Sequence, residues 1–451
     1  MTQPTKQHET SKPIPIPQRG ISGVPGILLH ILLCLTSAMI PLGVADAFDA
    51  TRLPHLAVEI ISVVILLLVG VYFFRTGKLA GKASRGMLPI LIFGGLLLIY
   101  MTLSAVPAAL CFSLIFAIGE GAVLLATAPK KTLATLPLIP LLSFGLSAVA
   151  CAGIDISLLC LLPLPATIAL ALGTRSSASK ETGLTRVGVI CLTSLCLGIT
   201  AIGFGAWFLH KSLGSLDISV IKDFLDALRE ELIAQIMALH IDTGKEIVYP
   251  FEGQETLITN VVAVTFNILP AVFVVICNVA AALSQMVTLS GLTAFGFGES
   301  ITDHVKAYRI SVVSAFVFLA SWVVALIANA ETSTMVGTVA ENFAIILLPG
   351  MALAGFLRLV QFMARKGCAP GCLIFLLFFI PCLSVNAIFI LAGFEGIASV
   401  FGPLIAKLKP PKDDDNIFPP SQDQGHDGSG DSDNSDNNNN NDTNDNGPRL
   451  F

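Results

Sequence analysis

The stretch ETLITNVVAVTFNILPAVFVVICNVAAALSQMVTL, residues 255–289, contains no charged side chain after Glu255. An α-helix rises about 1.5 Å per residue, so about 20 apolar residues cross the hydrocarbon core of a bilayer. The stretch exceeds that length, and a core helix of a soluble protein does not need so long an apolar run. We therefore expect a membrane-spanning helix here, bent at Pro270 because proline removes one backbone hydrogen bond.

Four carboxamides recur in this stretch at steps of 7, 11 and 7 residues: Asn260, Asn267, Asn278 and Gln285. At about 100° per residue these steps return to nearly the same direction, which predicts one polar edge along the helix. An amide facing lipid would have no hydrogen-bond partner, so the edge should face protein or a water-filled cavity. One interpretation is a substrate pathway or pocket. The alternative is a set of hydrogen bonds that hold helices together.

The composition indicates a polytopic membrane protein with an all-α fold. The chain has 451 residues, of which 54% are hydrophobic and 13% are charged, and its mean hydropathy is +0.80. Ordinary soluble domains carry about 25% charged residues. The net charge of −5 is unevenly divided, because residues 411–451 hold ten Asp against two basic residues, which leaves +3 for the rest. That distribution offers no basic surface for nucleic acid.

Eleven apolar runs predict a transmembrane bundle of about 10–11 spanning helices. The expected order is a disordered tail (1–20), about seven spanning helices (21–209), an extramembrane amphipathic segment (210–254), about four spanning helices (255–396), an interfacial segment (397–410) and a disordered Asp/Asn-rich tail (411–451). The runs are 22–44, 56–74, 87–103, 106–128, 133–152, 154–172, 187–209, 256–289, 311–330, 336–363 and 371–394.

The basic residues predict the orientation, because Lys and Arg concentrate on cytoplasmic loops. They alternate between successive loops as expected for a cytoplasmic N-terminus in a bacterial cell membrane. The first apolar run follows about 20 polar residues without a convincing cleavage site, so we interpret it as a retained helix. Lys407, Lys409 and Lys412 break the alternation. Either the helix count is wrong by one, or residues 398–408 lie in the interface.

The long connection contains an amphipathic pattern at residues 215–241. Apolar residues at helical spacing from Ile221 to Leu239 lie opposite acidic and basic residues, a pattern typical of a helix on a membrane surface or one that caps a bundle. The final Asp/Asn-rich tail cannot bury enough apolar surface to fold, so we expect it to be a solubilising or tethering segment.

Glu120 lies between Gly119 and Gly121 within an apolar run. Ionisable residues inside membrane segments are functional candidates by default, although Glu120 could instead reach water near the cytoplasmic end of its helix. The same run carries a small residue at every fourth position, which allows close helix contact: Ala105, Ala109, Ser113, Ala117 and Gly121. Asn342, about two turns before Pro349-Gly350, completes the candidate substrate pathway.

Enzyme signatures are missing from the sequence. It contains no HExxH, G-x-S-x-G, Walker A or dinucleotide-binding motif, so we expect no catalytic residues, no metal site and no cofactor. Without a nucleotide site, uphill transport would need ion coupling or an energising protein partner.

The C-terminal half resembles the YybS-like family of bacterial membrane proteins. The resemblance is carried by NILPAVFVVICNVAAALSQ (residues 267–285), VAENFAIILLPGMALAGFLRLV (residues 339–360) and a last helix expected over 373–394; LPLPATIALALG (residues 162–173) is similar to an earlier region of that family. The family looks distantly related to the substrate-binding components of energy-coupling-factor transporters. The resemblance implies a helical bundle with a small-molecule pocket, and it supplies no catalytic residues.

Two functions are therefore expected from the sequence. The first is a transport-type membrane component that binds an unknown small molecule in the lipid bilayer, with or without an energising partner. The second is a non-transporting scaffold that uses the amphipathic segment and the acidic tail for protein contacts.

Overall fold

The computed structural model describes residues 21, 23–79, 105–129, 137–151, 153–178, 186–239, 241–242, 247–248, 251, 253–295, 310–328, 335–365 and 385–408. The chain divides into Met1–Pro403 and Leu404–Phe451. Of the second unit, only the end of the last helix is described. The expected spanning run 87–103 and both expected disordered tails lie outside the described residues.

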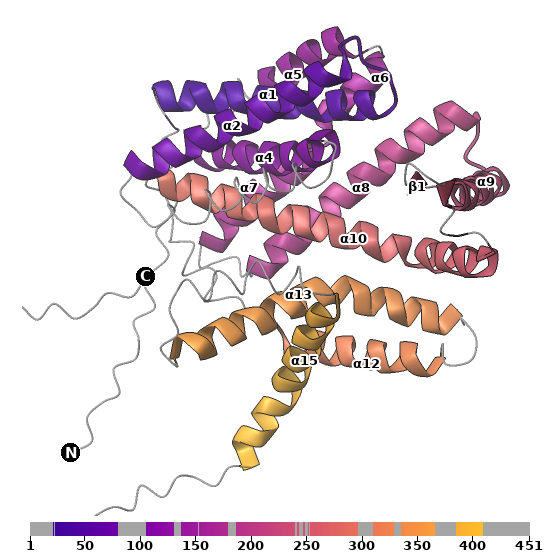
Figure 1. The fold of residues 1–451 in the computed structure, drawn as a ribbon. Helices are drawn as coiled ribbons and strands as arrows, with labels where there is room; N and C mark the ends of the chain where they lie inside the picture. The colour runs from indigo at the N-terminus through magenta and orange to yellow at the C-terminus, as the bar shows by residue number, and fades with distance from the viewer. Residues whose placement is uncertain are drawn as a thin grey trace, which may run out of the picture. The chain divides into compact units, whose positions relative to one another are not determined.

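The fold is a helical bundle (Figure 1). Its N-terminal helices are α1 (Val24–Ala47), α2 (His55–Leu79), α4 (Ala105–Thr127), α5 (Leu138–Ala150), α6 (Ile154–Ser157), the 3-10 turn η3 (Leu158–Leu161), α7 (Leu164–Ala178) and α8 (Arg186–Leu213). There follow α9 (Ile218–Met237), β1 (Ile241–Asp242), β2 (Ile247–Val248), α10 (Glu255–Ala294), α12 (Val312–Ala328), α13 (Met335–Arg365) and α15 (Val385–Leu408).

Most predicted runs are helices close to the predicted bounds. The organising stretch becomes α10, a helix of 40 residues that continues through Pro270. At about 1.5 Å per residue it is about 60 Å long, well beyond the hydrocarbon core. Seven described helices are long and apolar enough to cross a membrane, and three shorter apolar helices accompany them. These features are consistent with a multi-pass membrane protein.

Three details differ from the prediction. The expected single helix over 154–172 is divided into α6, η3 and α7. The segment before α10 contains a pair of two-residue antiparallel strands, β1 and β2. The last helix does not end near Gly393 as expected, because α15 runs unbroken from Val385 to Leu408 and includes residues assigned to an interfacial segment. Gly396 packs closely on Leu319 of α12, and such tertiary contacts override the low helix propensity of glycine.

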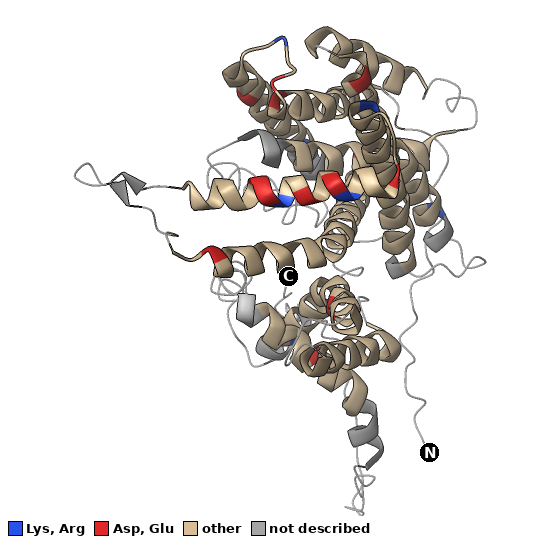
Figure 2. Cartoon of the chain, turned by 90° about the vertical axis from the view of Figure 1, so that its right-hand side faces the viewer, with Lys and Arg blue, Asp and Glu red and all other residues tan. Residues whose placement is uncertain are grey.

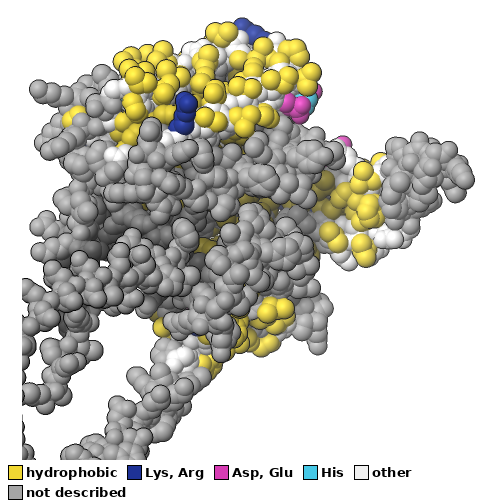
Figure 3. Space-filling view, turned by 60° about the vertical axis from the view of Figure 1, so that its left-hand side comes forward, with side chains coloured by type: hydrophobic (Ala, Val, Ile, Leu, Met, Phe, Trp, Pro, Cys, Tyr) yellow, Lys and Arg dark blue, Asp and Glu magenta, His cyan; other side chains and the backbone are white. Residues whose placement is uncertain are grey.

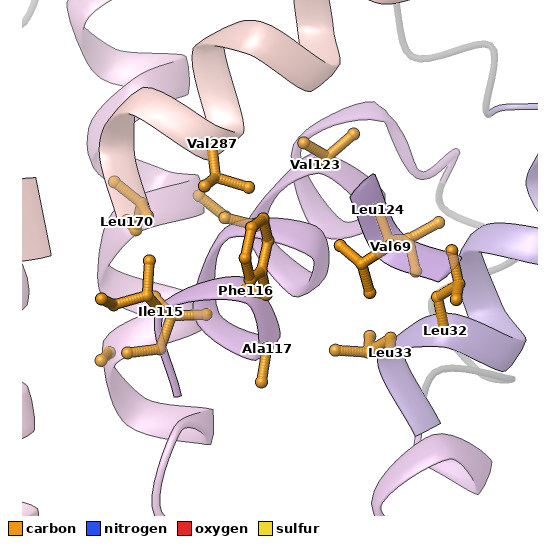
Figure 4. Packing of buried hydrophobic residues seen from close by; sticks show 14 of the residues in the cluster. Leu32, Leu33, Val69, Ile115, Phe116, Ala117, Val123, Leu124, Leu170 and Val287 are labelled. Carbon is orange, nitrogen blue, oxygen red and sulfur yellow. The ribbon is translucent and has the colours of Figure 1, made fainter. Parts of the chain in front are cut away.

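Helix α4 lies at the centre of the N-terminal helices and packs against α1, α2, α7 and α10. Its buried Phe116 and Ile115 lie among Leu170 of α7, Val287 of α10 and Val69 of α2 (Figure 4). Burying such side chains contributes about 1.5–3 kcal/mol each when water is the reference solvent. Lipid tails are as apolar as these side chains, so within a bilayer close packing must supply most of the stabilisation.

The glycines beside Glu120 allow this close packing, as the sequence predicted. A Cβ atom added at Gly119 would lie 2.6 Å from Val287 Cγ1 and 3.1 Å from the backbone oxygen of Ser284, both on α10. A Cβ atom at Gly121 would lie 2.7 Å from Thr167 Cγ2 on α7. The Gly119-Glu120-Gly121 segment is therefore the point at which two helices approach the backbone of α4.

Helices α12, α13 and α15 form a separate hydrophobic cluster around Phe318 and Met351. Here too a glycine permits the contact, because a Cβ at Gly355 of α13 would lie 2.4 Å from the backbone oxygen of Leu391 on α15.

Hydrophobic side chains cover the visible outer surface of the N-terminal helices, with few charged ones between them (Figure 3). The exposed large hydrophobic residues of α1 and α2 include Ile27, Leu28, Ile31, Ile60, Val64, Leu68 and Val71. A soluble monomer rarely exposes so large an apolar area. The surface is the one expected for a protein whose solvent is lipid.

Helix α9 differs from the others because charged residues of both signs are interspersed along it (Figure 2). None of its residues is buried, and it packs against α10. Its apolar side chains Ile218, Phe224, Leu225 and Leu228 are exposed. The amphipathic helix predicted over 215–241 is thus present.

We expect Gly119→Ala to lower the thermal stability of the detergent-purified protein. The added methyl group would force α10 away from α4, and overpacking of this kind costs about 1–3 kcal/mol. The matched control is Gly145→Ala in α5, where an added Cβ meets nothing within 4 Å and alanine favours the helix. Equal stability of the two variants would show that α4 and α10 are not in close contact.

Candidate functional site

Glu120 is fully buried at the centre of the N-terminal bundle, with 0% of its surface exposed. Thr36 of α1, which is also fully buried, donates a hydrogen bond from Oγ1 to Glu120 Oε2 at 3.0 Å. The second carboxyl oxygen, Oε1, has no hydrogen-bond partner within the described part of the chain. Glu120 therefore does not reach water here, which contradicts the alternative that the sequence left open.

Hydroxyl groups of α10 bind the backbone of α4 beside Glu120. Ser284 Oγ donates to the Ile115 oxygen at 3.1 Å, and Thr288 Oγ1 lies 3.3 Å from the Gly119 oxygen. Two polar residues spaced one helical turn apart thus meet two carbonyls spaced one turn apart. These bonds position α10, and they leave the Glu120 carboxyl uncompensated.

The basic residue Arg175 of α7 lies at the end of α4 and not at Glu120. Its Nε donates to the Ala126 oxygen at 2.9 Å and its Nη2 to the Ala128 oxygen at 3.2 Å. Ala126 is six residues beyond Glu120, or about 9 Å along the helix. A cation at the C-terminus of a helix is favourable, so this arginine has a local structural role.

The carboxamide edge of α10 changes its environment along the helix. Asn260 and Asn267 are exposed, Asn278 is half-buried and Gln285 is buried. The end of the edge that includes Gln285 lies in the stretch of α10 that packs on α4. The common direction of the four residues stays a prediction of the spacing, and none of them has a described hydrogen bond to Glu120.

The side chain of Asn342 on α13 makes hydrogen bonds with the backbone of α10 on both sides of Pro270. In a regular helix the Ala271 N–H would donate to the Asn267 oxygen. Here Ala271 N donates to Asn342 Oδ1 at 3.1 Å, while Asn342 Nδ2 donates to the Asn267 oxygen at 3.0 Å and to the Thr338 oxygen at 2.8 Å. Two of these bonds join α13 to α10, and the third, to Thr338, lies within α13. This candidate pathway residue therefore makes the interhelical bonds of the alternative interpretation.

The sequence analysis missed a second buried acid, Glu395 of α15. Arg358 of α13 places its Nε 3.0 Å from Glu395 Oε2, and Ser399 Oγ donates to Oε1 at 2.8 Å. The Arg358 contact is not aligned as a hydrogen bond, so it acts as an ion pair. In Gly393-Phe394-Glu395-Gly396 an acid directly precedes a glycine, as in α4. That was the available signal, but the helix was expected to end there.

A third polar group closes the turn between α1 and α2. His55 Nδ1 lies 2.5 Å from Oδ2 of the buried Asp46, and His55 Nε2 lies 3.4 Å from Glu59 Oε1. The short connection brings these residues together, although their spacing matches no motif. No group of His, Cys, Asp and Glu in the described chain is arranged to hold a metal ion.

Cys151, in the connection between α5 and α6, is not poised as a nucleophile. Only 1% of its surface is exposed, whereas reactive cysteines are partly exposed. The distinctive chemistry of the described chain is therefore a carboxyl group, Glu120, without a cationic partner.

We expect Asn342→Leu to destabilise the protein by roughly 0.6–1.7 kcal/mol for each interhelical hydrogen bond that is lost. The loss should be smaller when Pro270 is also replaced by Ala, because the restored helix can then satisfy Asn267 and Ala271 internally. Thermal unfolding of the four proteins of this double-mutant cycle measures the coupling. An equal loss in both backgrounds would contradict the proposed link between Asn342 and the proline.

Comparison with known proteins adds no relative: no protein-family description, no curated protein and no solved structure matches the chain.

Proposed function

We propose that this chain is a transport-type membrane component that binds a small molecule or ion, with Glu120 at the centre of its binding region. The observation that carries the proposal is the complete burial of Glu120 with one carboxyl oxygen unpartnered among the described residues. Ionisable groups inside membrane bundles mark ion and substrate pathways more often than they serve packing.

A purely structural role explains Glu120 poorly. Burying a carboxyl group without full hydrogen bonding costs several kcal/mol, whereas a leucine of similar size would fill the same space without that cost. Thr36 does not need the carboxyl either, because its hydroxyl lies 3.0 Å from the Leu32 oxygen and 3.2 Å from the Leu33 oxygen. A group that binds and releases a ligand would justify the cost.

Helix α10 is suited to couple such binding to movement. It packs on α4 at Gly119 and on α13 at Asn342, and Pro270 lies at the second of these contacts, between Asn267 and Ala271. Proline interrupts the backbone hydrogen bonds and allows the two parts of a helix to bend relative to each other. The amides of Asn260, Asn267 and Asn278, which retain exposed or half-exposed surface, would supply polar groups along the route of a solute.

The competing proposal is a membrane scaffold without transport. It is favoured by α9, whose apolar side chains are exposed and none of whose residues is buried. Such a helix could hold a partner protein or lie on the bilayer surface. This proposal gives no reason for an unpaired acid inside the bundle, so we favour transport. The bacterial cell membrane, the cytoplasmic N-terminus and the likeness to YybS-like proteins stay predictions of the sequence.

The test is native mass spectrometry of the protein purified gently from its own membranes. We expect a bound small molecule on the wild-type protein and its loss in Glu120→Gln and in the double variant Asn267→Leu/Asn278→Leu, because each removes polar groups from the proposed route.

The matched control is Thr265→Val on α10. Thr265 is exposed and bonds only to the Val261 oxygen of its own helix among the described contacts, so the molecule should be retained. An empty wild-type bundle that co-purifies with non-ATPase protein subunits would favour the scaffold.

A further inference from the structure

We propose that Glu120 is a proton-binding site, and that the structure holds it as a neutral carboxylic acid hydrogen-bonded to Thr36. The role of this proton in coupling rests on the proposed transport function, whereas the protonation itself does not.

The argument starts from the partners of the carboxyl group. A carboxylate offers about four acceptor sites on its two oxygens. Among the described residues, Glu120 receives one hydrogen bond, from Thr36 to Oε2, and none at Oε1. An ionised carboxylate in an apolar interior needs a cation or several donors to be tolerated. A neutral acid needs far less compensation, so this surrounding fits the protonated group.

The titratable groups of the helices packed on α4 have other partners or lie at a distance. On α1, His30 Nδ1 is 2.6 Å from the Gly26 oxygen, and Asp46 contacts His55 of α2. Arg175 of α7 binds two backbone oxygens of the α4 terminus. Glu255 begins α10, about 45 Å along that helix from its contact with Gly119.

The remaining titratable residues of α4 and of the helices packed on it complete the survey. Glu59 of α2 is bound in the group around His55, and the Tyr72 hydroxyl donates to the Pro25 oxygen. The other members are three thiols and two basic residues near the end of α2: Cys34, Cys111, Cys277, Arg75 and Lys78. No ion pair joins Glu120 to a basic residue of the described chain. Neutral thiols do not compensate a carboxylate.

A metal cation fits this position less well than a proton. Hard cations such as Ca²⁺ and Mg²⁺ take about six or more oxygen ligands, and the described side-chain oxygens in contact here are the two of Glu120 and that of Thr36. The neighbouring backbone oxygens of Ile115 and Gly119 already accept bonds from α10. A proton needs only a single oxygen of the carboxyl group.

Glu395 provides a control within the same chain. It is also buried and is followed by a glycine, but Arg358 lies 3.0 Å away and Ser399 donates to it. The Arg358 guanidinium supplies an opposite charge beside Glu395, whereas no described basic residue pairs with Glu120.

The test uses N,N′-dicyclohexylcarbodiimide, an apolar reagent that reacts with protonated carboxyl groups. The acid adds across one carbodiimide bond and the adduct rearranges to a stable acylurea, so the labelled peptide gains the whole reagent. At about pH 7 an ordinary glutamate is almost fully ionised. We expect at least about tenfold more adduct at Glu120 than at Glu395, a fall as the pH is raised, and none at position 120 in Glu120→Gln.

A second measurement does not depend on whether the carbodiimide can reach Glu120. The infrared carbonyl band of a protonated carboxyl group should be present in the wild-type protein at about pH 7, retained in Glu395→Gln and lost in Glu120→Gln. The proposal would be overturned if both the label and the infrared band were absent. It would also be overturned if replacing choline by sodium at constant pH protected Glu120 from labelling, because the site would then bind sodium. If Glu120 is labelled but native mass spectrometry finds no bound small molecule, the proton site is supported and only the transport function is contradicted.

Discussion

The close contact between α4 and α10 at Gly119 is the constraint on which the N-terminal bundle depends. Because Gly119 lacks a Cβ, Val287 packs directly on the α4 backbone, and the Ser284 and Thr288 hydroxyls reach α4 carbonyls. For a bundle in a bilayer, hydrophobicity cannot drive helices together, so small residues and interhelical hydrogen bonds would do so. The same contact, with that of α7 at Gly121, encloses Glu120.

Enclosure gives Glu120 its chemistry. A carboxyl group at the end of a membrane helix can reach water, but one held between glycines that admit two neighbouring helices cannot. Its partner Thr36 is a single weak donor, in contrast to the guanidinium that accompanies Glu395. Of these two acids, Glu395 lies beside a cation and Glu120 has none among the described residues. Only the second requires a functional explanation, and proton binding supplies one that agrees with coupling to transport.

Local patterns predicted much of this arrangement. Apolar runs predicted α1, α10 and α13, because a helix in lipid must satisfy its own backbone hydrogen bonds. The glycines around Glu120 indicated that other helices lie close to the backbone of α4. The bonds of Asn342 with Asn267 and Ala271 could not be predicted, because they join residues about 70 positions apart. The pairing of Arg358 with Glu395 was missed for a related reason: glycines that packing keeps helical were interpreted as a helix end.

The central claim is that Glu120 is kept for binding and not for stability, and thermal unfolding of the detergent-purified Glu120→Leu variant tests it most directly. Replacing an incompletely compensated buried acid by an apolar residue of similar volume is often neutral or stabilising. The account predicts a melting temperature equal to or above that of the wild-type protein. A clear fall would show that the Thr36–Glu120 contact holds the bundle together, and would contradict the assignment of Glu120 as a functional site.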